Sequence, residues 1–246
     1  MKNNIGPISL TSYISFTLLF FIAKSRMGFS PSDTSWIWYF LIITGIMQFI
    51  NNLYITHYAE VCGNYNITSA LSATLVPWIF IFTLSCICLV FIPGWLRVFS
   101  NTFGHMVANW AGLNQTINQI FTVPSNTTPQ NEQIKEAVTL LYTNRSKFIN
   151  EIELDYITDE NSTEYQDGKN WKSLNAILTF MQIPKPEITT DSEGKNVNLY
   201  KNLYKNLLLK EDVGYFIWLI LIGSISVLIS TNSLLMTTCD SVDFNF

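Results

Sequence analysis

Histidine, the side chain most often used for acid–base catalysis and metal binding, is scarce in this chain. The 246-residue sequence has two histidines, His57 and His105, which lie far apart. A metal site needs several ligands held together, and a histidine-based triad needs a nucleophile and a carboxylate beside the imidazole. No P-loop, paired-glycine dinucleotide motif, His-Glu-x-x-His or Gly-x-Ser-x-Gly motif occurs either. We therefore expect a protein that is not an enzyme, with no catalytic residue, cofactor or metal site, and interpret both histidines as polar residues at a membrane interface.

The remaining polar candidates fall into two sets. The acidic set of the middle region comprises Glu151, Glu153, Asp155, Asp159, Glu160 and Glu164. It lacks the ligand spacing of an EF-hand calcium loop, so it favours a solvated acidic loop. The uncharged set comprises Gln48, Asn51 and Asn52 in one apolar run, and Ser224, Ser226 and Ser230 in another. These side chains suit either a polar path through a membrane or hydrogen bonds between packed helices, of which the second is more common.

Four apolar runs dominate the rest of the chain, at Ile8–Ala23, Trp36–Tyr54, Ala70–Pro93 and Val213–Met236, and none contains Lys, Arg, Asp, Glu or His. A charged side chain at the centre of a bilayer costs about 2.5–3.5 kcal/mol by insertion scales, and about 20 helical residues cross the ~30 Å hydrocarbon core. The runs therefore predict an all-α membrane protein with four transmembrane helices. Pro77 predicts a kink in the third.

The first run resembles a signal peptide in position but not in its flanks. Lys2 is the only charge before it, and Ala23-Lys24-Ser25-Arg26 follows it where a small-residue cleavage site would be expected. We favour an uncleaved membrane anchor, with a cleaved signal peptide as the alternative.

Charged residues concentrate between the third and fourth runs. Eleven of the fourteen Lys and Arg lie between Arg97 and Lys210, and fourteen of the eighteen acids lie between Glu132 and Asp212. We predict a three-helix transmembrane region at 1–93, an interfacial helix and a mostly helical extramembrane insert at 94–212, and a fourth transmembrane helix with a short tail at 213–246. The net charge of −4 argues against nucleic-acid binding, which needs a basic face.

The segment after the third run has helical periodicity. Pro93-Gly94 ends the span, and apolar residues then recur at steps of three and four from Leu96 to Leu113. The residues that we expect to form an interfacial helix are Trp95, Phe99, Phe103, Met106 and Trp110. A re-entrant segment and a helix packed on the insert are the alternatives.

Further helices are predicted in the insert. We expect them at Asn131–Leu154 and Trp171–Ile183, with loops at Thr122–Gln130 and Glu187–Val197. Leu199, Leu203 and Leu207 line one stripe of a helix that runs close to, or into, the fourth span.

The basic residues predict how the chain is oriented. Lys24, Arg26, Arg97 and the lysines before the fourth run lie on one side of the spans, which the positive-inside rule places in the cytosol. The insert is then cytosolic and both termini are not. Cys62 and Cys239 would share the non-cytosolic side, where they are a candidate disulfide pair, although two unpaired cysteines are the simpler interpretation.

A part of the sequence resembles a known family. The residues Cys62-Gly63, Pro77-Trp78-Ile79-Phe80, Phe91-Ile92-Pro93-Gly94-Trp95 and Phe99-Ser100-Asn101-Thr102-Phe103-Gly104 are similar to a family of membrane-spanning minor capsid or inner-membrane proteins of large icosahedral DNA viruses, including chlorovirus-like and giant viruses. The resemblance covers roughly Cys62–Gly104 and does not extend to the insert.

The resemblance implies a structural component of a virion. Such a protein would sit in the internal viral membrane, derived from a host membrane, and anchor the capsid shell to it. Its partners would be lipid and the major and minor capsid proteins, with several copies in one assembly. The alternative function is a small membrane channel or permeabilising protein, suggested by the uncharged polar residues of the second and fourth runs.

Overall fold

The computed structural model describes most of the apolar part of the chain and a smaller share of the insert. The described residues are 5–27, 33–58, 64–92, 94–120, 139, 143, 145–152, 189–190, 196–197 and 199–236. The chain divides into two compact units. The first comprises Met1–Phe29, Asp33–Val98 and Tyr215–Phe246, and the second comprises Ser30–Ser32 and Phe99–Gly214.

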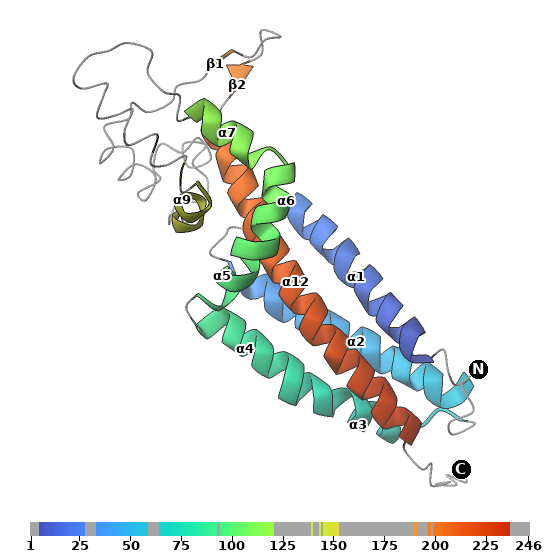
Figure 1. Cartoon of the computed structure of the whole chain (residues 1–246). Helices are drawn as coiled ribbons and strands as arrows, with labels where there is room; N and C mark the ends of the chain where they lie inside the picture. Colours follow the sequence, from blue (N-terminus) through green and yellow to red (C-terminus); the bar gives the residue numbers. More distant parts are fainter. Residues whose placement is uncertain are drawn as a thin grey trace, which may run out of the picture. The chain divides into compact units, whose positions relative to one another are not determined.

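Four helices among the described residues are long and apolar enough to cross a membrane. They are α1 (Ile5–Met27), α2 (Ser35–Tyr58), a third run made of α3 (Ile67–Pro77), η2 (Trp78–Thr83) and α4 (Leu84–Phe91), and α12 (Leu199–Met236), which belongs to the first unit from Tyr215 onward. They lie alongside one another in Figure 1. The predicted all-α membrane fold is confirmed, and the described residues of each apolar run lie within one of these helices apart from Ile92.

Local sequence signals explain where these helices begin and bend. The Asp33 carboxylate accepts a hydrogen bond from the Ser35 backbone N–H at 2.8 Å, and the Asn66 side chain accepts one from Ser69 at 2.9 Å. Both satisfy N–H groups that have no partner within the first helical turn. At Pro77, where the sequence predicts a kink, α3 gives way to the π-helical turn η2. Proline removes one backbone donor, and the wider winding accommodates that loss.

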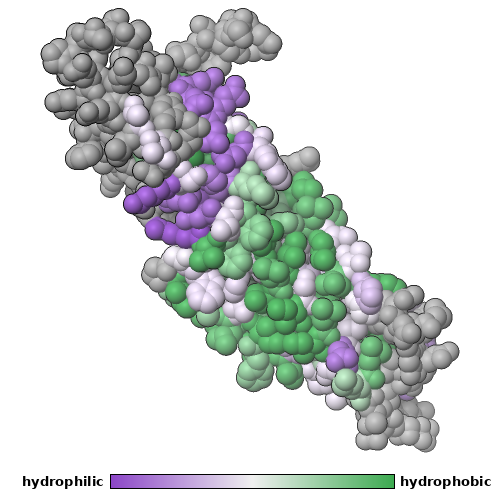
Figure 2. Space-filling view, in the orientation of Figure 1, coloured by the Kyte–Doolittle hydropathy of each residue, from purple (hydrophilic) through white to green (hydrophobic). Residues whose placement is uncertain are grey.

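Aromatic side chains fill the core of the first unit. Tyr13, Trp36, Phe40, Trp78 and Phe82 are all at most 5% exposed. Their rings meet edge to face, as between Phe40 and Phe82, whose centroids are 6.2 Å apart with the planes at 90°. Such edge-to-face pairs stabilise packing beyond their buried area. Large apolar side chains also cover the outside of this unit, as Figure 2 shows for one face, which is the distribution expected of helices solvated by lipid.

The second unit is built from short helices and the first turns of α12. After α5 (Trp95–Phe99) the chain forms η3 (Ser100–Gly104), α6 (His105–Trp110), α7 (Leu113–Ile120) and α9 (Arg145–Glu151). The predicted helix from Leu96 to Leu113 is therefore wrong in its last turn. Gly112, with φ of +103°, ends it after Trp110, and Leu113 begins a new helix.

The rest of the insert is described only in part. The two-residue strands β1 (Thr189–Thr190) and β2 (Asn196–Val197) pair antiparallel, with Thr189 opposite Val197, so the expected loop at Glu187–Val197 contains a small ladder. The prediction that the helix beginning near Leu199 runs into the fourth span is confirmed, because α12 covers both. Its predicted leucine stripe is at most 4% exposed. The expected loop at Thr122–Gln130, the expected helix at Trp171–Ile183 and most of that at Asn131–Leu154 lie outside the described residues.

Candidate functional site

A cluster of uncharged polar side chains lies inside the four-helix unit. The Asn52 amide Nδ2 donates to the hydroxyls of Thr74 and Ser230, both at 2.8 Å, and Asn52 Oδ1 accepts from Gln48 Nε2 at 3.0 Å. All four residues are at most 3% exposed. The cluster therefore joins α2, α3 and α12 by hydrogen bonds within an otherwise apolar core. In lipid, where water does not compete, these bonds hold helices together that the hydrophobic effect alone would not.

Two further hydrogen bonds join α1 to the other helices of the first unit. The Asn51 amide donates to the Ser9 hydroxyl at 2.7 Å, and the Tyr13 hydroxyl donates to the Leu219 backbone carbonyl at 2.7 Å. Tyr13 is fully buried and fits only because residue 223 is glycine, whose missing side chain leaves room for the phenol ring. Of the residues expected either to line a polar path or to bond neighbouring helices, Asn51, Asn52 and Ser230 do the second and Gln48 joins them, whereas Ser226 bonds the Ile222 carbonyl of its own helix.

One end of the four-helix unit carries a cationic and aromatic belt. The Lys24 ammonium lies 4.6 Å from the centroid of the Trp36 ring, and Trp36 packs edge to face on Tyr215. Trp95, at the start of α5, packs edge to face on Trp218 of α12 at 5.5 Å. Tryptophan, tyrosine and lysine gather where a spanning helix meets the headgroup region. The belt therefore has the composition expected at a membrane interface, and α5 begins beside it.

In the second unit the segment after α5 packs through its small residues. Ser100, Gly104 and Ala108 are spaced by four and are buried. A side chain on Gly104 would overlap the backbone carbonyl of Lys210, and one on Gly214 would meet Ser100 within 3.0 Å. Residues 100 and 104 thus face residues 214 and 210 of α12, so the two segments run antiparallel. Small residues allow this close approach of two backbones.

The residues expected to form an interfacial helix separate into two groups. Phe103, Met106 and Trp110 are 45, 44 and 76% exposed, and we refer to these three as the apolar stripe. Phe99 is half-buried. Trp95 belongs to the first unit, as does Trp218, on which it packs. Sequence reasoning found the apolar stripe but missed the small-residue face. A spacing of four between Ser100, Gly104 and Ala108 was the available signal.

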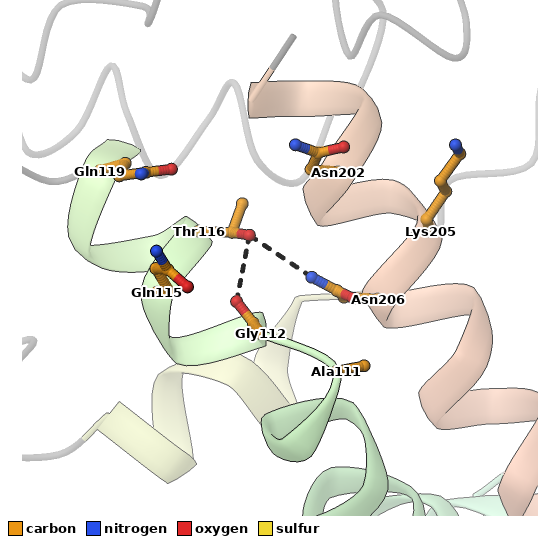
Figure 3. A pocket seen from close by; sticks show the side chains of 8 residues that line it. All are labelled: Ala111, Gly112, Gln115, Thr116, Gln119, Asn202, Lys205 and Asn206. Carbon is orange, nitrogen blue, oxygen red and sulfur yellow. Dashed lines mark hydrogen bonds between the residues drawn. The ribbon is translucent and has the colours of Figure 1, made fainter. Parts of the chain in front are cut away.

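A polar hollow of about 380 Å³ lies between α7 and the first turns of α12. Its lining residues are Ala111, Gly112, Gln115, Thr116, Gln119, Asn202, Lys205 and Asn206. In Figure 3 the Thr116 hydroxyl connects the two helices, because it donates to the Gly112 carbonyl at 3.1 Å and accepts from Asn206 Nδ2 at 3.4 Å. The lining offers amides, one hydroxyl and one ammonium group. It contains no carboxylate, imidazole or thiol that would carry out acid–base or nucleophilic chemistry.

The titratable candidates lie apart from this hollow. His105 lies on α6, where partial burial and, secondarily, the nearby charge of Lys210 lower its pKa below the usual value. His57 stacks on Tyr65 at 4.2 Å between ring centroids. Among the described residues no three His, Cys, Asp or Glu side chains come close enough to hold a metal ion. Cys62, Cys239 and the acidic set beyond Glu151 lie outside the residues that the structure describes.

No protein-family model, curated protein or solved structure matches the chain.

Proposed function

We propose that this chain is a structural membrane protein, a minor capsid component that anchors a virion's protein shell to its internal membrane. The observation that carries the anchoring role is α12, a single helix of 38 residues that contributes to both units. At 1.5 Å per residue it is about 57 Å long, well beyond the ~30 Å that a bilayer requires. The viral setting rests on the family resemblance of Cys62–Gly104.

The polar side chains of the spans support anchoring over conduction. Gln48, Asn52 and Ser230, which suggested a channel, bond to one another and to Thr74 in the buried interior of the first unit. A pore lining would turn these groups toward water. Reconstitution into planar bilayers should therefore give no conductance above that of protein-free membranes, and a reproducible unitary current would restore the channel alternative.

The proposal includes an orientation and partners. The positive-inside rule places the second unit on the cytosolic face, which becomes the capsid-facing side of a membrane taken from the host. Capsid proteins would then contact this unit, with several copies of the chain in each particle. This unit carries three exposed lysines, Lys147, Lys201 and Lys205, whose amines a cross-linking reagent can reach to detect such a contact.

Cross-linking of purified particles tests the proposal. In virions purified from cells that produce this chain, an amine-reactive cross-linker should join Lys147, Lys201 or Lys205 to capsid proteins. Lys24, which is 8% exposed and packed on Trp36, should form no such links and serves as the internal control. Absence of the chain from purified virions, or its presence without links to any capsid protein, would refute the capsid role.

A further inference from the structure

We propose that the apolar stripe of Phe103, Met106 and Trp110 is inserted into the surface of the lipid bilayer. It would form a second membrane contact in addition to the four spanning helices. This inference is independent of the capsid role, since it concerns only how the chain meets lipid.

The first argument is exposure. Residues 103, 106 and 110 are separated by three and four positions, so they share one side of the η3–α6 segment. Each of the three side chains is more than two-fifths exposed. Contiguous apolar side chains left in water are rare on soluble proteins and mark a contact with a membrane or another protein.

The second argument is that the segment cannot rotate to bury these side chains. Its Ser100, Gly104 and Ala108 side is fixed against α12, where Gly104 leaves no space for even one methyl group beside the Lys210 carbonyl. Turning the apolar stripe inward would place a benzyl or indole group where the packing admits only a hydrogen atom. The stripe must therefore be covered from outside.

The third argument selects lipid as the cover. Only Ile92, Pro93 and Gly94 separate the end of α4 from Trp95, so α5 begins within about 14 Å of the end of the third span. Trp95 is held at the interfacial belt by Trp218. From there the chain carries no Lys, Arg, Asp or Glu between Arg97 and Glu132. A segment that is tethered to the interface and lacks charges is suited to the headgroup region of a bilayer, where tryptophan is also favoured.

Collision accessibility of spin labels tests this insertion directly. The full chain, with Cys62, Cys86, Cys88 and Cys239 replaced by serine, would carry one nitroxide in turn at positions 103, 106 and 110. It would be measured in vesicles of phosphatidylcholine and phosphatidylglycerol. Gln115, exposed on α7 and lining the hollow, provides the water reference, and Leu19, exposed on α1, provides the lipid reference.

The stripe positions should collide with oxygen several-fold more often than with a water-soluble nickel chelate, as position 19 does, and unlike position 115. Preference for the nickel chelate at all three positions would overturn the inference. So would low collision with both reagents, which would indicate that another protein copy covers the stripe.

A second measurement avoids replacing the cysteines. Brominated lipids quench tryptophan in a depth-dependent manner, so the difference between the otherwise unmodified chain and its Trp110→Phe variant reports on Trp110 alone. We expect that difference emission to fall at least two-fold when lipids brominated near the headgroup replace ordinary ones. If this difference emission is the same in brominated and ordinary lipids, Trp110 is not inserted and the inference is wrong.

Discussion

At the scale of single residues, the buried amides show how this chain uses polarity within lipid. Asn52 donates hydrogen bonds to two side chains and accepts one from a third, and all three partners are themselves buried. An unpaired amide would be costly in hydrocarbon, so each partner contributes to the position of the others. The arrangement sets the relative register of α2, α3 and α12 at one level of the bundle.

A double-mutant cycle measures this contribution. Asn52→Ala and Ser230→Ala should each lower the free energy of unfolding, and their coupling should be about 0.6 kcal/mol and at most about 1.7, the range found for hydrogen bonds between membrane helices. Unfolding by SDS titration in mixed micelles gives these values. Ser72→Ala, which removes an exposed hydroxyl bonded only within its own helix, is the matched control. A coupling indistinguishable from zero would contradict the structural role of the cluster.

Gly104 allows a test in which two effects have opposite signs. In an unobstructed helix, Gly→Ala stabilises by about 1 kcal/mol. Here the added methyl group would overlap the Lys210 carbonyl, and overpacking costs about 1–3 kcal/mol. We expect Gly104→Ala to destabilise the chain and to speed amide exchange in α6. Gly6→Ala, at a helical position with nothing within 4 Å, is the control and should not destabilise. Stabilisation by Gly104→Ala would show that the close approach is wrong.

The lowered pKa of His105 predicts a pH dependence. Burial and the Lys210 charge favour the neutral imidazole in the folded chain. As the pH falls below about 6.5, the usual histidine value, the unfolded chain binds a proton that the folded chain does not, so stability decreases until the folded pKa is reached. Unfolding measured between pH 7.5 and 5.5 should show this slope, and His105→Gln should reduce it. Equal slopes in both proteins below pH 6.5 would contradict the assignment, while no difference is expected between pH 7.5 and 8.5.

At the scale of elements, the sequence predicted the apolar runs well and their connections less well. An uncharged stretch of about 20 residues in a membrane is expected to be helical, because its backbone N–H and C=O groups must bond to each other where no water is present. The π-helical turn after Pro77 and the break at Gly112 depend on how neighbouring backbone packs, which periodicity does not report. The small-residue side of the η3–α6 segment was overlooked for the same reason. Apolar periodicity identifies large side chains, whereas the residues that form this contact have very small side chains or no side chain at all.

The packing of α1 favours the uncleaved anchor over the cleaved signal peptide, and this prediction is testable. Its Ser9, Tyr13 and Thr17 side chains are at most 2% exposed, and two of them bond to α2 and α12. Cleavage after α1 would remove these buried side chains from the core of the first unit. We expect mass spectrometry of the chain purified from membranes to recover peptides covering residues 5–27. A mature N-terminus beyond Arg26 would show that α1 is cleaved and that the remaining spans pack without it.

At the scale of the whole molecule, composition predicted two regions of different character. The structure divides the chain at Val98 and Gly214, close to where charged residues begin and end. The antiparallel contact of the small residues with α12 was not predictable, because it joins residues about a hundred positions apart. The polar hollow combines α7 with α12 across a similar separation. Neither has a local sequence signal beyond the spacing of a few small or amide residues.

Glycosylation mapping tests the predicted orientation. The acceptor triplets begin at Asn66, Asn114, Asn126, Asn144 and Asn161. If the second unit is cytosolic, the last four cannot receive sugar, because the transferase works only on the lumenal side. Translation in the presence of microsomes should therefore give no glycan at Asn126 or Asn144, as judged by the mobility of Asn126→Gln and Asn144→Gln variants. A sugar on either residue would invert the orientation.

The bond between Tyr13 and Leu219 has a consequence for the order of biosynthesis. Its donor and acceptor are 206 residues apart. At ribosomal speeds of about 5–20 residues per second, the Leu219 carbonyl is therefore synthesised roughly 10–40 s after the Tyr13 hydroxyl. During that interval the Tyr13 hydroxyl cannot donate to the carbonyl that it bonds in the complete chain. Synthesis of α12 then supplies that carbonyl, so a chain truncated before Leu219 would lack the bond between the first and last helices.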